Sequence, residues 1–444
     1  MSKKVLIISH NVLSTSENMG KTLLSYFQDW GKGNLAQLYF HSQVPVTNKC
    51  IRYYRFTDMD ALKSIVLRGR YGRTYNEDDI NKELITSRVD NGIQALLYEK
   101  GRKRTALIYW LRNTVWAMSS WHSKKLNRWI DEFNPNAVFF ASGDYSFAYR
   151  IAIRIASERH IPLYMACFDD YYLYNSNNNS FLGRAVYSRY MEWVRKAAAY
   201  SECIFCLCEK MAKDYSDLFK KPCYTVYTST ELSNNLPMIS KGKDIVYLGN
   251  IGLNRHLSLL EIGHALKKLD LPHIPKHIDV FSAEKSKKIL KGLNEGNGIV
   301  FHGAVSSDEV KKIIRNSMLV IHTESFDSKT ISQVRYSVST KIADCLSSGT
   351  CILAYGPPNV ASIEYLANNK AAYIINSKEG LENGLKEIIS NKLLREKIVK
   401  NAVELAHRNH DRKTASAIIK DVIENDGTPK WGRDEDTSSE RRIQ

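Results

Sequence analysis

The segment 337–358 most constrains how this chain can fold, because it joins a helix start directly to an apolar strand. Ser339 or Thr340 can cap the N-terminus of a short helix, and Gly349 suits the left-handed conformation that ends one. The apolar run 350–355 follows at once and is closed by Gly-Pro-Pro, as in a strand buried within a parallel sheet. The segment therefore predicts a helix and a central strand of an α/β sheet.

The start of this helix is suited to bind an anion. The amides of Thr340, Lys341 and Ile342 lie in the first turn, where no intrahelical acceptor exists. We expect them to point outward at the positive end of the helix dipole. Lys341 adds a full positive charge, and Asp344, one turn later, can accept hydrogen bonds from a sugar attached to the phosphate. These residues predict a nucleotide site.

The same segment resembles the nucleotide-binding motif of retaining glycosyltransferases of the family 4 type, written Pro-x-Lys-(apolar)-x-Glu-(aromatic)-(apolar)-Ala-x-Gly. Lys341, Asp344 and Gly349 occupy its spaced positions, although Asp344 replaces the usual Glu and Ser339 the usual Pro. The family's earlier Glu falls on Tyr336. The resemblance implies an α/β protein of the GT-B fold, in which two Rossmann-like doubly wound domains face each other across a cleft. It also implies that Asp344 holds the nucleotide ribose.

A second loop resembles the same family's Gly-Arg-x(n)-Lys-Gly donor loop, in which the number of residues between Arg and Lys varies. It contains Gly249, then Asn250 where the family commonly has an arginine, and Arg255 at the start of the next helix. Its glycines let the backbone close on a diphosphate, which Arg255 can neutralise. Because the carboxyl ends of parallel strands share one edge, we expect Arg255 and Lys341 at one donor site. Glu-Ser-Phe-Asp at 324–327 resembles the family's Glu-Ser-Phe-Gly, but it lies too far upstream to be in register.

The length of 444 residues favours about two domains, at a prior of roughly 150 residues each. The order of strand-like and helical segments predicts an acceptor-side Rossmann-like domain at 1–235, with a basic helical insertion at about 58–134. A nucleotide-sugar-binding Rossmann-like domain is expected at 243–424, after a linker rich in turn formers. The segment 425–444 has little apolar content and predicts a disordered tail.

Gly20 and Lys21 form part of the first strand-to-helix connection. Gly20-Lys21-Thr22 is similar to the end of a nucleotide-triphosphate P-loop, but Thr15 stands where that motif needs its first glycine. In the resembled family, a glycine in this loop lets the backbone approach the sugar diphosphate and the acceptor. We therefore expect Gly20 and Lys21 to line an acceptor or phosphate loop. A plain loop glycine is the alternative.

Asp169 and Asp170 follow the expected strand 161–168, at the edge where doubly wound sheets bind ligands. Related enzymes often place a His or Asp at this point, so we expect one of the two carboxylates to accept the proton of the acceptor hydroxyl. Successive strand side chains alternate in direction, so the other would be a cap or the partner of a cation. Asp170 is the slightly favoured residue. A purely structural role for the pair is the alternative.

The composition is that of an ordinary globular protein. The arrangement of its cysteines does not indicate a metal site. No segment is long and apolar enough to span a membrane, and the N-terminus reads as a strand rather than a signal peptide, which predicts a cytoplasmic protein. Cys203, Cys206 and Cys208 form the one cysteine cluster, but their alternation indicates a strand, and no second ligand pair lies at zinc spacing. We expect neither a metal nor a cofactor.

The formal charge of +16 is concentrated in two basic clusters, at 49–73 and 100–128. Four of the seven tryptophans accompany the second cluster: Trp110, Trp116, Trp121 and Trp129. Basic side chains combined with interfacial aromatics favour a surface that lies on an anionic membrane. The alternatives are a solvated basic face over core tryptophans, or a nucleic-acid surface. The chain has no recognisable nucleic-acid module, so we expect no nucleic-acid partner.

Together these features predict a glycosyltransferase of the hexosyltransferase type. It would move a sugar from a nucleotide-diphosphate sugar to a saccharide or lipid-linked acceptor, without a metal, in cell-surface polysaccharide or glycan synthesis. Retention of the anomeric configuration is implied by the resemblance alone. The alternatives are another GT-B enzyme, such as a nucleotide-sugar epimerase or an inverting transferase, or a non-catalytic scaffold that binds nucleic acid.

Overall fold

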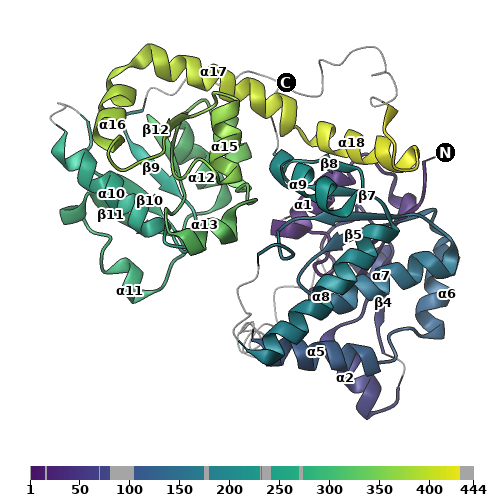
Figure 1. The fold of residues 1–444 in the computed structure, drawn as a ribbon. Coiled ribbons are helices and arrows are strands. Elements are labelled where there is room, and N and C mark those ends of the chain that lie inside the picture. The colour runs from purple at the N-terminus through teal and green to yellow at the C-terminus, as the bar shows by residue number, and fades with distance from the viewer. Residues whose placement is uncertain are drawn as a thin grey trace. The chain divides into compact units, whose positions relative to one another are not determined.

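The computed structural model divides the chain into two compact units, each with its own sheet of mostly or wholly parallel strands (Figure 1). The N-terminal unit contains Met1–Val226 and Ala415–Gln444, and the C-terminal unit contains Tyr227–Thr414. The structure describes residues 2–15, 18–69, 71–80, 105–174, 180–230, 232, 242–269 and 274–430.

The N-terminal unit is built on an eight-stranded sheet of order β4-β3-β2-β1-β5-β6-β7-β8. All neighbouring strands are parallel except β3 and β4, which are antiparallel. The order reverses direction between β1 and β5, which is the switch point of a doubly wound sheet. The strands are β1 (Val5–Ser9), β2 (Leu35–Tyr39), β3 (Tyr53–Arg55), β4 (Arg73–Tyr75), β5 (Ala137–Ser142), β6 (Leu163–Cys167), β7 (Ser201–Cys206) and β8 (Cys223–Thr225).

Helices cover both faces of this sheet. Because successive strand side chains point to opposite faces, Phe139 of β5 packs on Phe27 and Phe205, whereas Phe140 packs on Tyr149 of α7. The helices described in this unit are α1 (Asn18–Tyr26), η1 (Lys32–Asn34), α2 (Asp58–Val66), α5 (Ala106–Met118), α6 (Lys124–Phe133), α7 (Ser146–Arg159), α8 (Phe181–Tyr200) and α9 (Glu209–Phe219). Helix α18 (Arg412–Glu424) joins α1 on the Phe139 face, where Ile419 and Ile423 enter the core.

The return of α18 changes the domain boundaries from those that the sequence predicts. From Ala415 onward this helix belongs to the N-terminal unit, not to a domain at 243–424, and the first division falls after Val226 rather than near 235–243. Polar contacts fix it there, because Tyr164 Oη donates to the Ile423 carbonyl at 3.4 Å. The start of the expected disordered tail is also held, since Tyr224 Oη donates to the Gly427 carbonyl at 2.9 Å. Residues 431–444 lie outside the described part of the chain.

The C-terminal unit has a six-stranded parallel sheet of order β11-β10-β9-β12-β13-β14, with its switch point between β9 and β12. Its strands β9 and β13 are continuous buried apolar runs, as expected for strands covered on both faces. They are β9 (Ile245–Leu248), β10 (Ile278–Phe281), β11 (Ile299–Gly303), β12 (Leu319–Thr323), β13 (Cys351–Tyr355) and β14 (Tyr373–Ile375).

Three long helices pack their apolar sides on one face of this sheet: α10 (Arg255–Lys268), α16 (Leu381–Ser390) and α17 (Lys392–Asn409). Leu259, Leu385 and Val399 are one buried residue from each. Between the strands lie the shorter helices α11 (Lys287–Leu290), η2 (Glu295–Asn297), α12 (Ser307–Arg315), α13 (Ser328–Val334), α14 (Lys341–Leu346) and α15 (Ala361–Asn368). The helix and strand predicted from 337–358 are therefore confirmed as α14 and β13, next to the switch point.

The basic insertion is helical where it is described, but its tryptophans mostly form core. Trp116 is fully buried and stacks on Phe147 at 4.0 Å between ring centroids, and Trp121 and Trp129 are also buried. Only Trp110, at 46% exposure, is an exposed member of this group of four. The interpretation of these tryptophans as a membrane-facing set is therefore wrong for three of them. Apolar packing between α5, α6 and the sheet accounts for their position.

Candidate functional site

The donor loop of the C-terminal unit follows β9 at the switch point of the sheet. Gly249 ends the strand, and the next turn is stabilised by Asn250, whose Oδ1 accepts from the Gly252 amide at 2.7 Å. Leu253 and Asn254 then adopt left-handed conformations, with φ of 54° and 58°. Such backbone is unfavourable for a leucine and recurs at ligand-binding turns. Arg255 follows as the first residue of α10.

Gly249 and Lys341 lie against each other, although they are far apart in sequence. A Cβ atom at position 249 would lie only 2.9 Å from Lys341 Nζ, so the glycine leaves the space that the ammonium group occupies. In the described part of the chain, Lys341 Nζ has no hydrogen-bond or ion-pair partner within reach. Burial lowers the pKa of Lys341, the nearby Arg255 lowers it further, and Cys345 and Asp344 offset part of this shift. An anion placed here would give the ammonium a direct ion pair.

Arg255 is held by a buried carboxylate at the same edge of the sheet. Its Nε and Nη2 donate to the two oxygens of Glu324 at 2.9 and 3.0 Å, and Glu324 directly follows β12. Both side chains are largely buried, with 14% and 2% exposure. Burial raises the pKa of Glu324, and Arg255 offsets part of that rise. Arg255 is therefore at the predicted place, but two of its nitrogens donate hydrogen bonds to Glu324.

The start of α14 differs from the predicted anion seat. The Ile342 amide donates to the Ser339 carbonyl at 2.9 Å, and the Lys341 amide lies 3.4 Å from Ser339 Oγ. Thr340 occupies the cap position without a side-chain cap, because the turn at Ser339 already satisfies these donors. Two of the three amides expected to face a ligand are thus engaged. The Lys341 side chain, rather than the helix amides, is the group available to an anion.

Asp344 is positioned by a residue from the start of this unit. Thr230 Oγ1 donates to Asp344 Oδ1 at 2.6 Å, which fixes the carboxylate next to the segment that opens the C-terminal unit. The predicted acid of the motif is therefore oriented by a hydroxyl group before any ligand binds. Its role toward a ribose stays a prediction.

The switch point of the N-terminal unit also gathers polar groups. His10 follows β1, His41 follows β2 and Tyr145 follows β5. The ring centroid of His10 lies 5.4 Å from that of His41 and 4.9 Å from that of Tyr145. Arg112 of α5 stacks on Tyr145 with its Cζ 3.8 Å from the ring centroid. Burial, with Arg112 nearby, lowers the pKa of His10 well below its ordinary value, so its imidazole is neutral near pH 7.

His10 is a candidate that sequence reasoning missed. Its Nδ1 is buried and has no hydrogen-bond partner among the described residues. A neutral imidazole at the carboxyl edge of the sheet is suited to accept a proton or to bind a hydroxyl group. The signal was present in the sequence, since His10 comes directly after the buried strand β1.

Gly20 lies inside α1 rather than in the loop before it. A Cβ at this position would lie 2.4 Å from the Val12 carbonyl oxygen, so glycine is needed for close packing of the loop on the helix. Lys21 is exposed on the next position. The structure thus gives Gly20 a packing reason, and the predicted role of both residues in contacting an acceptor or phosphate stays a prediction.

Asp169 and Asp170 occupy the predicted place after β6, with different surroundings. Asp170 Oδ1 accepts from the amides of Tyr172 and Leu173 and from Tyr215 Oη, at 3.1, 2.9 and 2.8 Å, so it holds the turn together. Asp169 is exposed and accepts from Tyr171 Oη at 3.1 Å. We expect one residue of the pair to have a structural role. The geometry assigns that role to Asp170. Asp169 becomes the better candidate for chemistry.

Comparison with known proteins identifies the fold of this chain. Residues 263–419 match the family described as glycosyl transferase-like. The structure aligns with HepE of Anabaena, solved in complex with UDP, over 95% of this chain and 100% of that chain, at 10% identity and a TM-score of 0.61. The chain has the GT-B fold. The fold class and the family resemblance predicted from the motif at Lys341 are confirmed.

Other GT-B structures align over nearly the whole chain as well. The alignment with TarM covers 95% of this chain and 98% of the TarM chain, at 9% identity and a TM-score of 0.59. WaaG is described as a glycosyltransferase involved in lipopolysaccharide biosynthesis. Its alignment covers 94% of this chain and 99% of the WaaG chain, at 11% identity and a TM-score of 0.52. No curated protein matches the sequence. At such low identities the likeness concerns the fold, and the site must be argued from this chain's own residues.

Two further residues of this GT-B donor edge escaped sequence reasoning. Glu324 was seen as part of a motif but was out of register with Lys341, and the sheet brings it to Arg255 instead. His322, near the end of β12, bonds through Nε2 to Ser362 Oγ at 2.9 Å, and burial together with Arg255 lowers its pKa to about 3. Both lie where the apolar run of β12 gives way to polar residues, which was the available signal.

The described residues contain no group of three or more His, Cys, Asp or Glu side chains arranged to hold a metal ion. Cys203 and Cys206 lie on the buried strand β7, and burial raises the pKa of both thiols well above the ordinary value. Cys208 caps α9, where its Sγ accepts from the Met211 amide. The predicted strand is therefore confirmed for Cys203 and Cys206, whereas Cys208 lies beyond it at the start of a helix.

Proposed function

We propose that this GT-B protein is a glycosyltransferase that moves a sugar from a nucleotide-diphosphate donor to a saccharide or lipid-linked acceptor, in cell-surface polysaccharide or glycan synthesis. One observation carries the proposal: the ammonium of Lys341 lies against Gly249, without a hydrogen bond or ion pair among the described residues, at the edge where doubly wound sheets bind ligands. A diphosphate is the anion that such a donor would bring to this place.

In this proposal the cations of the C-terminal unit stabilise the departing nucleotide diphosphate. Negative charge grows on the diphosphate as the bond to the sugar breaks, and a fixed, partly desolvated ammonium is worth most at that moment. Lys341 supplies this charge directly. Arg255, anchored by Glu324, adds a fixed guanidinium at the same edge of the sheet. The reaction would then need no metal from the protein. Retention of configuration is the outcome to test by following the anomeric proton of the product.

The first donor to test is a uridine nucleotide. HepE was solved with UDP and also with UDP-glucose, and these structures share only the fold with this chain. Asp344, oriented by Thr230, is the proposed ribose ligand, because its carboxylate can accept from two neighbouring hydroxyls. The match of residues 263–419 to the glycosyl transferase-like family supports this choice of unit.

Binding should be measured by thermal shift and calorimetry with nucleoside diphosphates of different bases. A ligand at about one hundred times its dissociation constant stabilises the folded chain by about 2.7 kcal/mol. Failure of every nucleoside diphosphate and nucleotide sugar to bind would contradict the proposal. Release of nucleotide only when an acceptor is present would separate a transferase from an epimerase, which turns over its donor alone.

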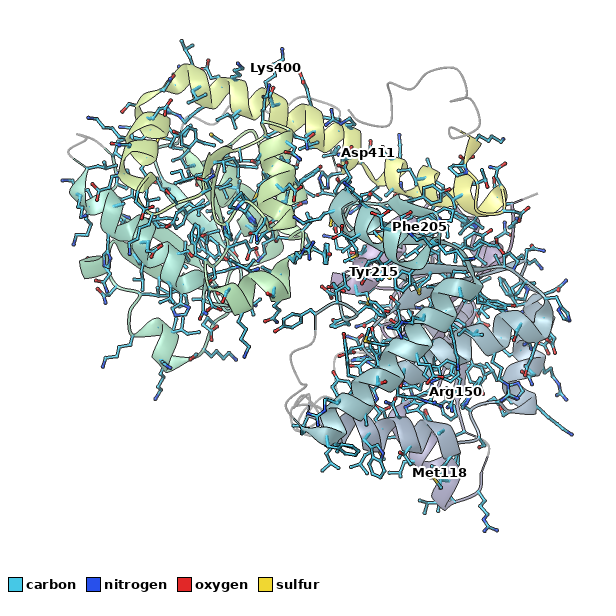
Figure 2. All side chains as sticks on the ribbon, in the orientation of Figure 1. Met118, Arg150, Phe205, Tyr215, Lys400 and Asp411 are labelled. Atoms are coloured by element: carbon cyan, nitrogen blue, oxygen red, sulfur yellow. The ribbon has the colours of Figure 1, made fainter. Side chains whose placement is uncertain are left out.

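The proposed acceptor could be presented at a membrane, because the N-terminal unit exposes an apolar surface. Helices α2 and α5 pack against each other, and eight of the sixteen exposed large apolar side chains among the described residues lie on them or at their ends. This α2–α5 surface consists of Met59, Leu62, Val66, Leu67, Leu107, Trp110, Leu111 and Met118. Figure 2 shows Met118 at the outer end of α5. Among the described residues, none of the helices combines the length and apolar character needed to cross a bilayer.

Cations flank this surface, which suits the anionic headgroups of a cytoplasmic leaflet. Lys63 and Arg68 are exposed on and just after α2. Apolar residues that enter the headgroup region and cations that meet the phosphates together give reversible peripheral binding. We therefore propose a cytoplasmic protein that docks on the membrane through the α2–α5 surface. The predicted basic residues Lys100, Arg102, Lys103 and Arg104 lie outside the described part of the chain.

A further inference from the structure

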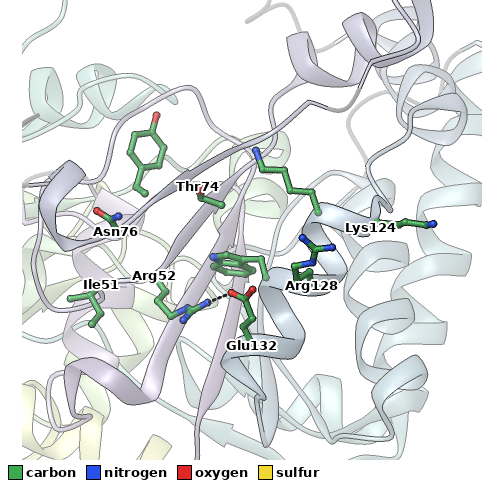
Figure 3. A pocket seen from close by; sticks show the side chains of 10 residues that line it. Ile51, Arg52, Thr74, Asn76, Lys124, Arg128 and Glu132 are labelled. Atoms are coloured by element: carbon green, nitrogen blue, oxygen red, sulfur yellow. Dashed lines mark hydrogen bonds and ion pairs between the residues drawn. The ribbon is translucent and has the colours of Figure 1, made fainter.

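A cavity lies beside α6 in the N-terminal unit, far along the chain from the proposed donor residues (Figure 3). Its volume is about 580 Å³, and it is bounded by one face of α6 and by the strands β3 and β4 with their flanks. Ligand pockets in proteins range over roughly 300–1,000 Å³, so the space suits a small molecule or a headgroup. We call it the α6 groove, after the residues Arg52, Thr74, Asn76, Lys124, Arg128 and Glu132, which Figure 3 labels around it.

The lining of the α6 groove is strongly cationic. Arg52, Lys124, Lys125 and Arg128 contribute four positive charges, whereas Glu132 contributes the only carboxylate among the lining residues. Glu132 already pairs with one of these cations, since its Oε2 accepts a hydrogen bond from Arg52 Nη2 at 3.2 Å. The buried Nε of Arg52 has no hydrogen-bond partner among the described residues. Three cations therefore remain without a carboxylate in the groove.

These cations occupy positions that cost the helix stability. Lys124 and Lys125 are the first residues of α6, where the helix dipole is positive, and its first turn contains no acidic residue to compensate. Lys124 and Arg128 also stand four residues apart on one face, where like charges repel. In the described part of the chain, neither side chain has a hydrogen-bond or ion-pair partner. A bound anion would remove both penalties, because it would face the dipole and neutralise the pair.

The remaining walls allow more than a bare ion. Trp129 and Tyr75 contribute aromatic surface to the groove, while Thr74 and Asn76 contribute polar groups along the edge strand. Lys125, which also lines the groove, donates through Nζ to the Gly72 carbonyl at 2.7 Å. Along α6, the lining residues from Lys124 to Glu132 extend over roughly 12 Å at 1.5 Å per residue. The groove can therefore hold a phosphate group together with the ring or chain that carries it.

We propose that the α6 groove is a binding site for a phosphate-bearing ligand, either a soluble sugar phosphate or the headgroup of an anionic lipid. Phosphate is the shared chemistry, because its oxygens accept from several Lys and Arg donors at once. All the residues of the groove belong to the N-terminal unit, whereas Lys341 and Arg255 belong to the C-terminal unit. The inference therefore stands independently of the proposed donor chemistry.

Calorimetry with inorganic tripolyphosphate tests the site on the full chain while the donor site is saturated with UDP. The parent should still bind tripolyphosphate, and Lys124→Gln with Arg128→Gln should weaken that binding by roughly tenfold or more, as expected for the loss of two charge-assisted contacts. The matched control is Lys397→Gln with Lys400→Gln, which removes the same charge from exposed positions on α17. Figure 2 shows Lys400 on that helix. The control should change the affinity less than twofold, and both variants should bind UDP as the parent does.

Two further arms locate the site and identify the source of the phosphate. Hydrogen exchange should show protection of amides in α6 and β4 on addition of tripolyphosphate, and Thr74→Trp should block binding by filling the groove without changing its charge. Glucose 6-phosphate and vesicles of phosphatidylglycerol with phosphatidylcholine then separate a soluble from a lipid source. Loss of tripolyphosphate binding once UDP is present, equal weakening in the α17 control, or protection elsewhere would overturn the proposal. If UDP itself fails to bind, the same titration without UDP tests the groove alone.

Discussion

Arg255 and Glu324 form a two-point ion pair at the switch point of the C-terminal sheet, with Nε–Oε2 and Nη2–Oε1 distances of 2.9 and 3.0 Å. The pair joins the start of α10 to the end of β12, so the donor loop after β9 is tied to the neighbouring strand. Ser258 strengthens this link, since its Oγ donates to the Glu324 carbonyl at 3.0 Å. The donor edge is therefore built as one fixed element before a ligand arrives.

Loss of either partner of this pair should destabilise the C-terminal unit. Arg255→Ala leaves the buried Glu324 carboxylate without its cation, which typically costs about 3–5 kcal/mol. Urea unfolding of Arg255→Ala, Glu324→Ala and the double variant measures the coupling. We expect the double variant to be more stable than the sum of the single losses predicts. Additive losses would show that the pair does not stabilise the loop.

Lys341 should contribute to donor binding and little to folding. Lys341→Ala removes an ammonium that makes no hydrogen bond or ion pair among the described residues and whose pKa burial lowers, so the free energy of unfolding should change little. Binding of a nucleoside diphosphate should weaken by roughly 1.5–3 kcal/mol, the range for a hydrogen bond to a charged group. Calorimetry compares it with Lys397→Ala, an exposed lysine of α17. A Lys341→Ala variant that binds the diphosphate as tightly as the parent would remove the proposed donor site.

Asp169 and Asp170 should separate into a chemical and a structural residue. Asp169→Asn should lower turnover by roughly 10²–10⁴-fold if the carboxylate accepts the acceptor proton, with donor binding unchanged. Asp170→Asn should instead lower stability, because Oδ1 accepts three hydrogen bonds in the turn after β6. Initial rates at saturating donor and acceptor and unfolding curves are to be measured for both. A loss below about tenfold in Asp169→Asn would direct attention to His10 or to the donor phosphate as the base.

His410 should make stability fall as the pH decreases. Its Nδ1 lies 2.6 Å from the Thr228 carbonyl, which can only accept, so Nδ1 carries the proton and Nε2 accepts from Tyr365 Oη at 2.9 Å. Burial lowers the pKa of His410 to about 4. The unfolded chain, with a histidine pKa of about 6.5, therefore binds more protons between these values, and the stability present above pH 6.5 is lost toward pH 4.

From this one group we expect the free energy of unfolding to be about 2 kcal/mol lower at pH 5 than at pH 7. Urea titrations across this window should show a smaller pH slope in His410→Asn than in the parent. His264→Asn, an exposed histidine of α10, should keep the parent slope. An unchanged slope in His410→Asn would contradict the assignment of a neutral imidazole at this position.

Membrane binding should depend on the apolar residues of the α2–α5 surface. Leu107→Ser with Leu111→Ser removes two neighbouring side chains of α5 that are 54% and 47% exposed. Sedimentation with phosphatidylglycerol vesicles should lose most of the bound protein, and high salt should weaken the remainder by screening the cations. Leu218→Ser with Leu393→Ser, exposed leucines of α9 and α17, should pellet as the parent does. Equal pelleting with neutral and anionic vesicles would contradict an electrostatic contribution.

The sequence alone determined elements of the fold and the edge of the sheet at which the donor site is proposed. Buried parallel strands are continuous apolar runs, so the strands predicted at 161–168 and 350–355 are present as β6 and β13. Arg255 and Lys341 could be assigned to one site because each lies at the start of a helix in a connection between parallel strands, and parallel strands share their carboxyl edge. Spacing within a motif is a local property, which the order of residues is sufficient to specify.

The tertiary structure decided which side chains pair and which are buried. Glu324 is out of register with the motif in sequence, yet the adjacency of β9 and β12 brings it to Arg255. Trp116 belongs to the core because α5 packs on α7 through Phe147, and α18 joins the first unit because Ile419 and Ile423 find its core. These outcomes depend on contacts between distant segments. The free energy of each such contact depends on which residues from other parts of the chain pack against it, and no local sequence pattern specifies those residues.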